Sequence, residues 1–386
     1  MGFRRLADWL ESRWATPAYS GWVVLGIALF FFGAATNTMA GWLYVMSGMM
    51  MAMLSISTMW PQQALKGLIV SRTPMVPVMA GQALWVDLKV ANTTTSAKRL
   101  LQVRDQLPRT LAAPQLRSLP SILAQDHRYW RYEIPTHRRG VHTWQTVTLR
   151  SAAPLGLFWC SRPQAAPAKA VVYPQILPLT RCPLLDQLGD ESGLQWQRDQ
   201  SANAGTEGLT RALRPYRWGD PTRLIHWRTS ARYGELRVRE LEQFTSSPSI
   251  TIALDTGGPW LPEAFEQAVI VAASLYIYGL KQGLSTQFWS GETGMICDRT
   301  AVLTTLAGIL PGGATTHPLP AHGLIWLGTH RPRTLPPHSH VIGFAGATAA
   351  HSQAAHSQAA LADADLPITP DDDLLRQLQQ QPIAHR

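Results

Sequence analysis

The sequence predicts a two-helix transmembrane hairpin, then a small all-β sandwich, then an α/β domain with a mostly parallel sheet. Residues 14–65 carry no charged side chain, residues 70–175 hold short alternating runs, and from residue 249 strand-like runs alternate with helical ones. A chain of 386 residues is long enough for two or three domains with substantial cores.

The membrane region is expected to cover residues 1–66, with helices over residues 20–36 and 40–59. Both runs are apolar, and a helix needs about 20 such residues to cross a bilayer. A cleaved signal peptide is the alternative for the first run. It fits poorly, because the second run follows at once and no small-residue cleavage site separates them.

Positive charges flank this hairpin on one side only. Arg4, Arg5 and Arg13 precede it, Lys66 and Arg72 follow it, and its short turn is uncharged. Positive flanks mark the cytoplasmic side, so both termini and the soluble domains are expected to be cytoplasmic. The odd number of cysteines, three, agrees with a reducing compartment. The net charge of +9 suits either nucleic acid or an anionic membrane surface.

Residues 70–175 are expected to form the β-sandwich. Apolar side chains alternate with polar ones over residues 84–90, which is the period of a half-buried strand. Further short strands are expected near residues 100–103, 129–134, 143–149 and 169–173. Residues 107–126 lack periodicity and are expected to be a loop.

Residues 176–248 contain a segment that is dense in arginine. Its eight arginines are Arg211, Arg214, Arg217, Arg223, Arg228, Arg232, Arg237 and Arg239, and its aromatic residues are Tyr216, Trp218, Trp227 and Tyr233. The planar guanidinium group pairs bidentately and stacks on rings, so the composition indicates an organised site.

A helix is predicted over residues 221–232 of this segment. Asp220 can cap its beginning, a proline follows in the first turn, and Gly234 can end it in the left-handed conformation. Helical spacing would then turn Trp227 towards the core and place Arg228 and Arg232 together on another face.

Residues 249–345 are expected to form the α/β domain. Strands are predicted over residues 249–255, 285–289, 323–327 and 341–344, and helices over 263–282 and 300–309. Residues 346–386 are expected to be a disordered tail, with a short helix at its end left open.

The central segment resembles the signature of the bacterial family catalogued as domain of unknown function 58. The matching residues are Arg214, Tyr216, Gly219, Asp220, Arg223, Ile225, Trp227, Ser230, Ala231, Arg232 and Gly234. Upstream, residues 138–140, 153–159 and 172–174 are similar to the family as well, as are two membrane helices before a β-rich region.

The resemblance implies an inner-membrane protein whose C-terminal part has a von Willebrand factor A-like fold. Genes of this family commonly accompany MoxR-type AAA+ ATPases and transglutaminase-like membrane proteins, so an AAA+ ATPase and other membrane proteins are the implied partners. The chemistry of the family is not established. The expected binding residues are Arg214, Tyr216, Asp220, Arg223, Trp227, Arg228, Ser230 and Arg232.

Asp255 is the one candidate metal ligand. The usual von Willebrand A motif is Asp-x-Ser-x-Ser, which supplies oxygen ligands to Mg²⁺. Here Gly257 and Pro259 replace both serines, so no cofactor is expected and Asp255 is predicted to cap the turn after its strand. Mg²⁺ remains the alternative.

Three functions stay open. The arginine segment is expected first to be an internal ion-pair lattice, then a partner-binding surface, and last a nucleic-acid site. Its arginines outnumber the nearby carboxylates, so not all of them can be paired locally. No Gly-x-Ser-x-Gly turn or phosphate loop occurs, so an enzyme is not expected. The leading hypothesis is a membrane-anchored docking protein. A membrane-tethered nucleic-acid binder is the second, less favoured one, and an uncharacterised enzyme is the third.

Overall fold

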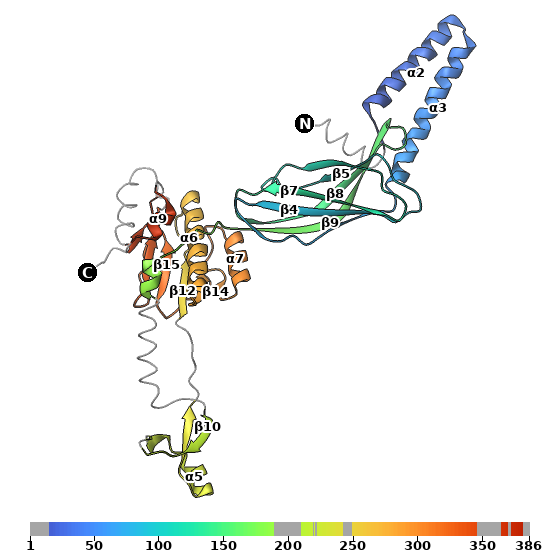
Figure 1. Ribbon diagram of the computed structural model, residues 1–386. Coiled ribbons are helices and arrows are strands. Elements are labelled where there is room, and N and C mark those ends of the chain that lie inside the picture. Colours follow the sequence, from blue (N-terminus) through green and yellow to red (C-terminus); the bar gives the residue numbers. More distant parts are fainter. Residues whose placement is uncertain are drawn as a thin grey trace. The chain divides into compact units, whose positions relative to one another are not determined.

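The computed structural model describes residues 15–188, 210–218, 220, 222–241, 249–345, 364–369 and 372–380. The chain divides into two compact units, Met1–Pro174 and Gln175–Arg386 (Figure 1). The first unit contains a helical hairpin and two sheets, and the second contains a mixed α/β sheet and a small arginine-rich module.

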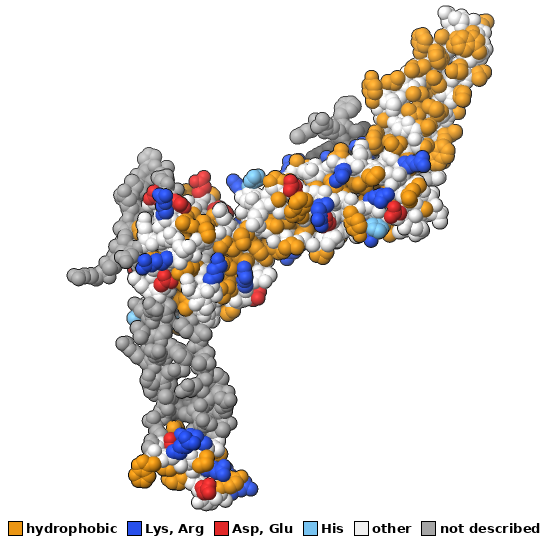
Figure 2. All heavy atoms as spheres, in the orientation of Figure 1, with side chains coloured by type: hydrophobic (Ala, Val, Ile, Leu, Met, Phe, Trp, Pro, Cys, Tyr) orange, Lys and Arg blue, Asp and Glu red, His pale blue; other side chains and the backbone are white. Residues whose placement is uncertain are grey.

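The hairpin consists of α2 (Tyr19–Thr38) and α3 (Gly41–Ala64), joined through Met39 in the left-handed conformation. Small residues let the helices approach: Ala28 and Ala35 are fully buried, and the Ser47 hydroxyl donates to the Ala28 carbonyl at 2.9 Å. Both helices are long and apolar enough to cross a membrane. Hydrophobic side chains cover the visible surface of the hairpin (Figure 2).

The base of the hairpin is bonded to the β-rich part of the same unit. At the start of α2, the Ala18 amide donates to the Leu157 carbonyl at 2.8 Å. At the end of α3, the Lys98 ammonium donates to the Gln63 carbonyl at 3.1 Å. A Cβ on Gly21 would lie 2.3 Å from the Leu157 oxygen, so only glycine permits this approach. The hairpin and the sheets therefore form one attached body.

Two sheets pack face to face behind this base. One has the order β2 (Leu68–Arg72), β4 (Ala83–Asn92), β7 (His127–Pro135). The other has the order β1 (Thr16–Pro17), β9 (Phe158–Tyr173), β8 (Gly140–Ser151), β5 (Leu101–Asp105), β6 (Gln115–Leu119), and β3 (Val78–Met79) also pairs with β9. The alternation predicted for residues 84–90 is confirmed, because its apolar members are fully buried. Residues from both sheets share one hydrophobic core.

Strand β6 corrects the prediction of a loop over residues 107–126. Gln115–Leu119 pairs antiparallel with β5 along its whole length. Most of its side chains are at least partly exposed, so it lacks the apolar alternation that marks a half-buried strand. Only its hydrogen bonds to β5 identify it as a strand.

A polar network crosses the interior between the two sheets. Arg72 on β2 donates through Nη1 and Nη2 to Asp105 on β5 at 2.5 and 2.6 Å, and through Nε to the Ala166 carbonyl on β9. Tyr132 on β7 and Trp144 on β8 donate to the same carboxylate. The side chains of Arg72 and Asp105 are 3% and 0% exposed. Arg72, one of the positive charges that follow the hairpin in the sequence, is therefore buried and paired with Asp105.

The second unit contains a six-stranded sheet. Its order is β14 (Gly294–Ile296), β13 (Ser285–Ser290), β12 (Ser249–Leu254), β15 (Leu324–Gly328), β16 (His340–Gly343), β17 (Leu366–Pro367). All neighbours are parallel except β14, which pairs antiparallel with β13. The connecting helices are α6 (Pro262–Lys281), which is largely buried, and α7 (Arg299–Gly308).

Part of the predicted disordered tail is ordered, so that prediction is wrong for residues 364–369 and 372–380. β17 extends the sheet beside β16, and α9 (Leu374–Leu378) follows it. Leu366, Ile368 and Leu378 are buried, and this burial offsets the entropy of ordering the segment. Residues 346–363, 370–371 and 381–386 lie outside the described part of the chain.

We expect Asp105→Asn to destabilise the first unit strongly, because it leaves a buried arginine without its counter-charge. Breaking one partner of a buried ion pair costs about 3–5 kcal/mol. Denaturant unfolding of the purified protein, followed by hydrogen exchange in β2 and β5, measures the change. Asp87→Asn is the control, since Asp87 pairs with the exposed Arg131 and should matter little. Equal effects of the two changes would contradict a central role for the network.

Candidate functional site

The arginine-rich segment folds into a small module of two strands and a short helix. β10 (Thr210–Pro215) pairs antiparallel with β11 (Arg237–Leu241), and the 3₁₀ turn Thr222–Leu224 and α5 (Trp227–Tyr233) connect them. Ile225 bridges to Val238, and both are buried. A module of this size has a minimal apolar centre, so its polar contacts determine its shape.

The helix begins later than predicted, and its cap is different. His226 caps α5: its Nδ1 accepts from the Thr229 amide at 3.2 Å. The prediction that Asp220 is the cap is therefore wrong. Gly234 ends the helix with φ 72°, as predicted.

Asp220 instead binds Arg214. Two hydrogen bonds of 2.7 Å join the guanidinium to the carboxylate, and the Arg217 amide donates to the same carboxylate at 2.8 Å. The hydrogen bonds from Arg214 and from the Arg217 amide lower the pKa of Asp220. The carboxylate therefore stays ionised and holds the turn after β10.

Ser230 joins the helix to the strand that follows. It is buried, its hydroxyl donates to the His226 carbonyl at 3.1 Å, and it accepts from the Arg237 amide at 2.9 Å. The Arg237 guanidinium lies over the Tyr233 ring, 4.4 Å from its centroid. Ser230, like Arg214 and Asp220, thus holds the module together.

Other predicted residues face solvent. Trp227 is 65% exposed, so the prediction that it belongs to the core is wrong. The helix begins later than predicted, so Trp227 is the first residue of α5. The helical spacing predicted from residue 221 therefore does not apply to its side chain. Trp218 is 99% exposed and Tyr233 60%.

The exposed aromatic rings share the module with unpaired arginines. Arg228 and Arg232 are exposed, and within the described residues neither forms an ion pair. Tyr216 is half-buried, while the side chain of Arg223 lies outside the described set. Over residues 210–241, eight arginines against three carboxylates leave a formal charge of +5. Figure 2 shows basic and hydrophobic side chains beside one another on this module.

A second candidate site lies at the carboxyl edge of the sheet in the second unit. Asp255 follows β12, and β12 and β15 are the neighbours between which the strand order reverses direction. In open α/β sheets, this is where ligands bind. Asp255 Oδ1 accepts from the Gly257 amide at 2.9 Å, which confirms the predicted turn cap.

Among the residues that the structure describes, the other carboxylate oxygen of Asp255 is buried without a hydrogen-bond partner, as is the Thr256 hydroxyl. His330 Nδ1 lies 3.9 Å from that oxygen. Burial raises the pKa of Asp255. Within the described residues, no group of three or more histidine, cysteine or acidic side chains is placed to hold a metal ion.

The comparisons with known proteins do not assign this arrangement. No protein-family model matches the chain, and no curated protein matches it significantly. Solved structures similar to part of the chain include a CARDB domain from Pyrococcus furiosus, with a TM-score of 0.19 at 8% identity over 26% of this chain and 94% of that one. A β-glucosidase from Listeria innocua has a TM-score of 0.16 at 11% identity, covering 26% and 16%.

A DNA glycosylase from Pseudomonas fluorescens, bound to DNA with an abasic site analog, has a TM-score of 0.18 at 16% identity, covering 28% and 33%. Similarities this weak carry no argument about fold or function.

We expect Asp255→Asn to stabilise the second unit at neutral pH. Because the pKa of Asp255 is raised in the folded state, ionisation of the carboxylate lowers the free energy of unfolding above that pKa. This loss of stability disappears as the pH falls towards 3.8, the ordinary pKa of the group. The advantage of the variant should therefore shrink on acidification.

Thermal unfolding at a series of pH values measures this difference. Asp298→Asn serves as the control, because Asp298 is an exposed helix cap and asparagine caps equally well. If the Asp255→Asn variant is less stable than the wild type at every pH, the native state needs the charge.

Proposed function

We propose that this protein is a membrane-anchored docking subunit whose arginine-rich module, residues 210–241, binds a partner protein in the cytoplasm. One observation carries the proposal: the module divides its unusual residues into two sets. Arg214, Asp220 and Ser230 hold it together, while the exposed Trp227 and Arg228 make no internal contact of that kind within the described residues.

The exposed set has the composition of a binding hot spot. Tryptophan, tyrosine and arginine dominate the energetics of protein interfaces, where truncating a central one costs about 2 kcal/mol or more. Leaving Trp218 and Trp227 in water has no structural benefit to the module, whereas a partner that covers them gains their apolar area.

The hairpin supports the membrane anchor. Both helices could cross a membrane, and the start of α2 and the end of α3 are bonded to the same end of the sheets. The sequence has Arg4, Arg5 and Arg13 before the hairpin and Lys66 after it, and by the positive-inside rule these charges support a cytoplasmic location for both termini and the soluble domains.

The partner proposed is an AAA+ ATPase of the MoxR type, together with other membrane proteins. This choice rests on the resemblance of the signature residues to the domain of unknown function 58 family. A von Willebrand A-like fold for the second unit belongs to the same proposal. The strand order of its sheet, with the first strand central and the edge strand β14 antiparallel, is a doubly wound order and supports it.

A membrane-tethered nucleic-acid binder is the second candidate. The exposure of Trp227 favours it, because exposed rings can stack on bases while arginines contact phosphates. The formal charge of +5 over the module points the same way.

We expect Trp227→Ala, and the double change Arg228→Ala with Arg232→Ala, each to lower retention of the ATPase at least tenfold. A loss of about 1.4 kcal/mol corresponds to tenfold, less than a hot spot contributes. The measurement is co-purification from detergent-solubilised membranes with ATP hydrolysis blocked. Arg333→Ala, an exposed arginine outside the module, is the control.

Retention that survives both variants would refute the docking site. Nucleic acid bound by the wild type, with affinity that falls steeply with salt and is lost in the same variants, would instead establish the second candidate.

The orientation is tested by thiol labelling in intact cells. Cys297 is exposed, whereas Cys160 and Cys182 are buried, and burial raises the pKa of Cys182 to about 11. A membrane-impermeant maleimide should label a Met39→Cys variant and leave Cys297 unlabelled until the cells are lysed. Labelling of Cys297 in intact cells would reverse the proposed topology.

A further inference from the structure

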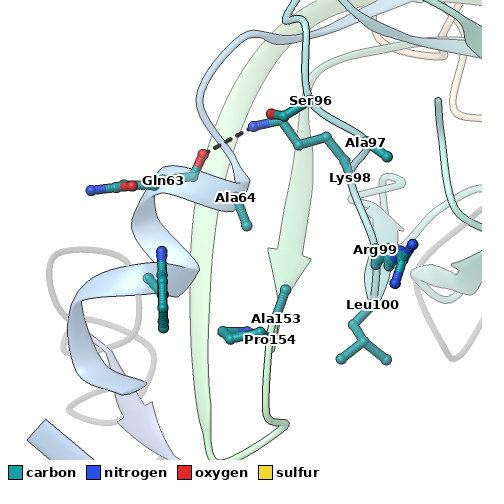
Figure 3. A pocket seen from close by; sticks show the side chains of 10 residues that line it. Gln63, Ala64, Ser96, Ala97, Lys98, Arg99, Leu100, Ala153 and Pro154 are labelled. Atoms are coloured by element: carbon teal, nitrogen blue, oxygen red, sulfur yellow. Dashed lines mark hydrogen bonds between the residues drawn. The ribbon is translucent and has the colours of Figure 1, made fainter. Parts of the chain in front are cut away.

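A cavity lies where the last turn of α3 meets the sheets of the first unit (Figure 3). It has a volume of about 420 Å³. Trp60 and Ala64 of α3 line one wall, Lys98, Arg99 and Leu100 ahead of β5 line another, and Pro154 closes a third. The cavity therefore has an apolar part and a cationic part.

Within the described residues, the cationic part has no counter-charge of its own. None of the residues that line the cavity there is acidic, so Lys98 and Arg99 line it without a carboxylate. Lys98 is 6% exposed, and burial lowers the pKa of its ammonium group. A buried cation is costly unless an anion and hydrogen bonds compensate it.

Lys98 has hydrogen-bonding capacity left. Its one hydrogen bond within the described residues goes to the Gln63 carbonyl, whereas an ammonium group has three protons to donate. Its main chain is fixed by two hydrogen bonds to Ile122, at 2.8 and 2.9 Å. The ammonium is thus held in place beside the cavity, with donors available to an acceptor there.

The cavity also lies at the end of the apolar stretch of α3. The candidate span ends at Trp60, an amphipathic residue of the kind enriched where membranes meet water. Ile56 and Met59, on the turn before, are exposed and would contact acyl chains. A molecule with an anionic head and apolar tails fits both surroundings at once.

We propose that this cavity binds the phosphate of an anionic glycerophospholipid, with Lys98 and Arg99 as its cationic ligands and the acyl chains lying along α3. The proposal rests on the membrane anchor proposed above. Zwitterionic lipids carry their own cation beside the phosphate, so lipids with net negative charge are preferred.

The test uses full-length protein reconstituted into phosphatidylcholine vesicles with and without phosphatidylglycerol. Native mass spectrometry then counts the lipid that stays bound. The wild type should retain phosphatidylglycerol in preference to phosphatidylcholine. Lys98→Gln and Arg99→Gln should each weaken that retention roughly fivefold, as expected for one basic residue at a membrane surface.

Two further variants make the result specific. Lys98→Arg keeps the charge and should keep the lipid. Lys66→Gln removes an exposed charge next to α3 that does not line the cavity, and should have little effect. Arg99 is exposed, so its variant tests the site even if Lys98→Gln does not fold.

Each contrary outcome has a distinct meaning. Equal losses with Lys66→Gln would show general surface attraction and overturn the site. Displacement of the lipid by soluble glycerol phosphate would show that a free phosphate is the occupant and overturn the lipid assignment. Flotation of the vesicles on a density gradient shows whether the protein is inserted. Protein that floats with the vesicles but retains both lipids equally overturns the cavity proposal alone. Protein that does not float overturns the membrane anchor as well.

Discussion

The buried pair of Arg72 and Asp105 is the constraint on which the first unit depends. A guanidinium group in a protein interior needs a carboxylate in the right geometry, and here it also needs the Ala166 carbonyl. These contacts, with Tyr132 and Trp144, connect β2 and β7 of one sheet to β5, β8 and β9 of the other. The two sheets are therefore linked through one shared carboxylate in their interior. The same strands carry the loops that are bonded to the hairpin, so the placement of α2 and α3 depends on this pair.

The arginine-rich module shows a different use of the same residue type. Arg214 and Asp220 fix a turn, and the backbone of Arg237 is tied to Ser230, so about half of the signature is explained by the module's own stability. The exposed remainder is not explained that way. The exposed Trp227, Arg228 and Arg232 form the surface that the proposed partner would cover. Residues that stabilise the module and residues exposed on its surface therefore alternate within one short stretch of sequence.

How much could be predicted from the sequence depends on the range of the interactions involved. The hairpin, the strand over residues 84–90 and the βαβ alternation follow from local periodicity, and the structure has them. Trp227 could not be placed, because a helix turns about 100° per residue and a cap at His226 instead of Asp220 changes which face is buried. β6 and β17 can be recognised as strands only from the neighbouring strands with which they pair. The Arg72 network joins residues far apart in sequence, and no local pattern marks it.

The close contact at Gly21 has a mechanical consequence. With no side chain between them, the first turn of α2 and the carbonyl of Leu157 are in direct contact, and the end of α3 is bonded through Lys98. A hairpin in a bilayer adjusts to lipid thickness by tilting. If the hairpin spans a bilayer as proposed, we expect tilting to move the β8–β9 loop and the segment ahead of β5, so the thickness of the membrane becomes a force on the sheets.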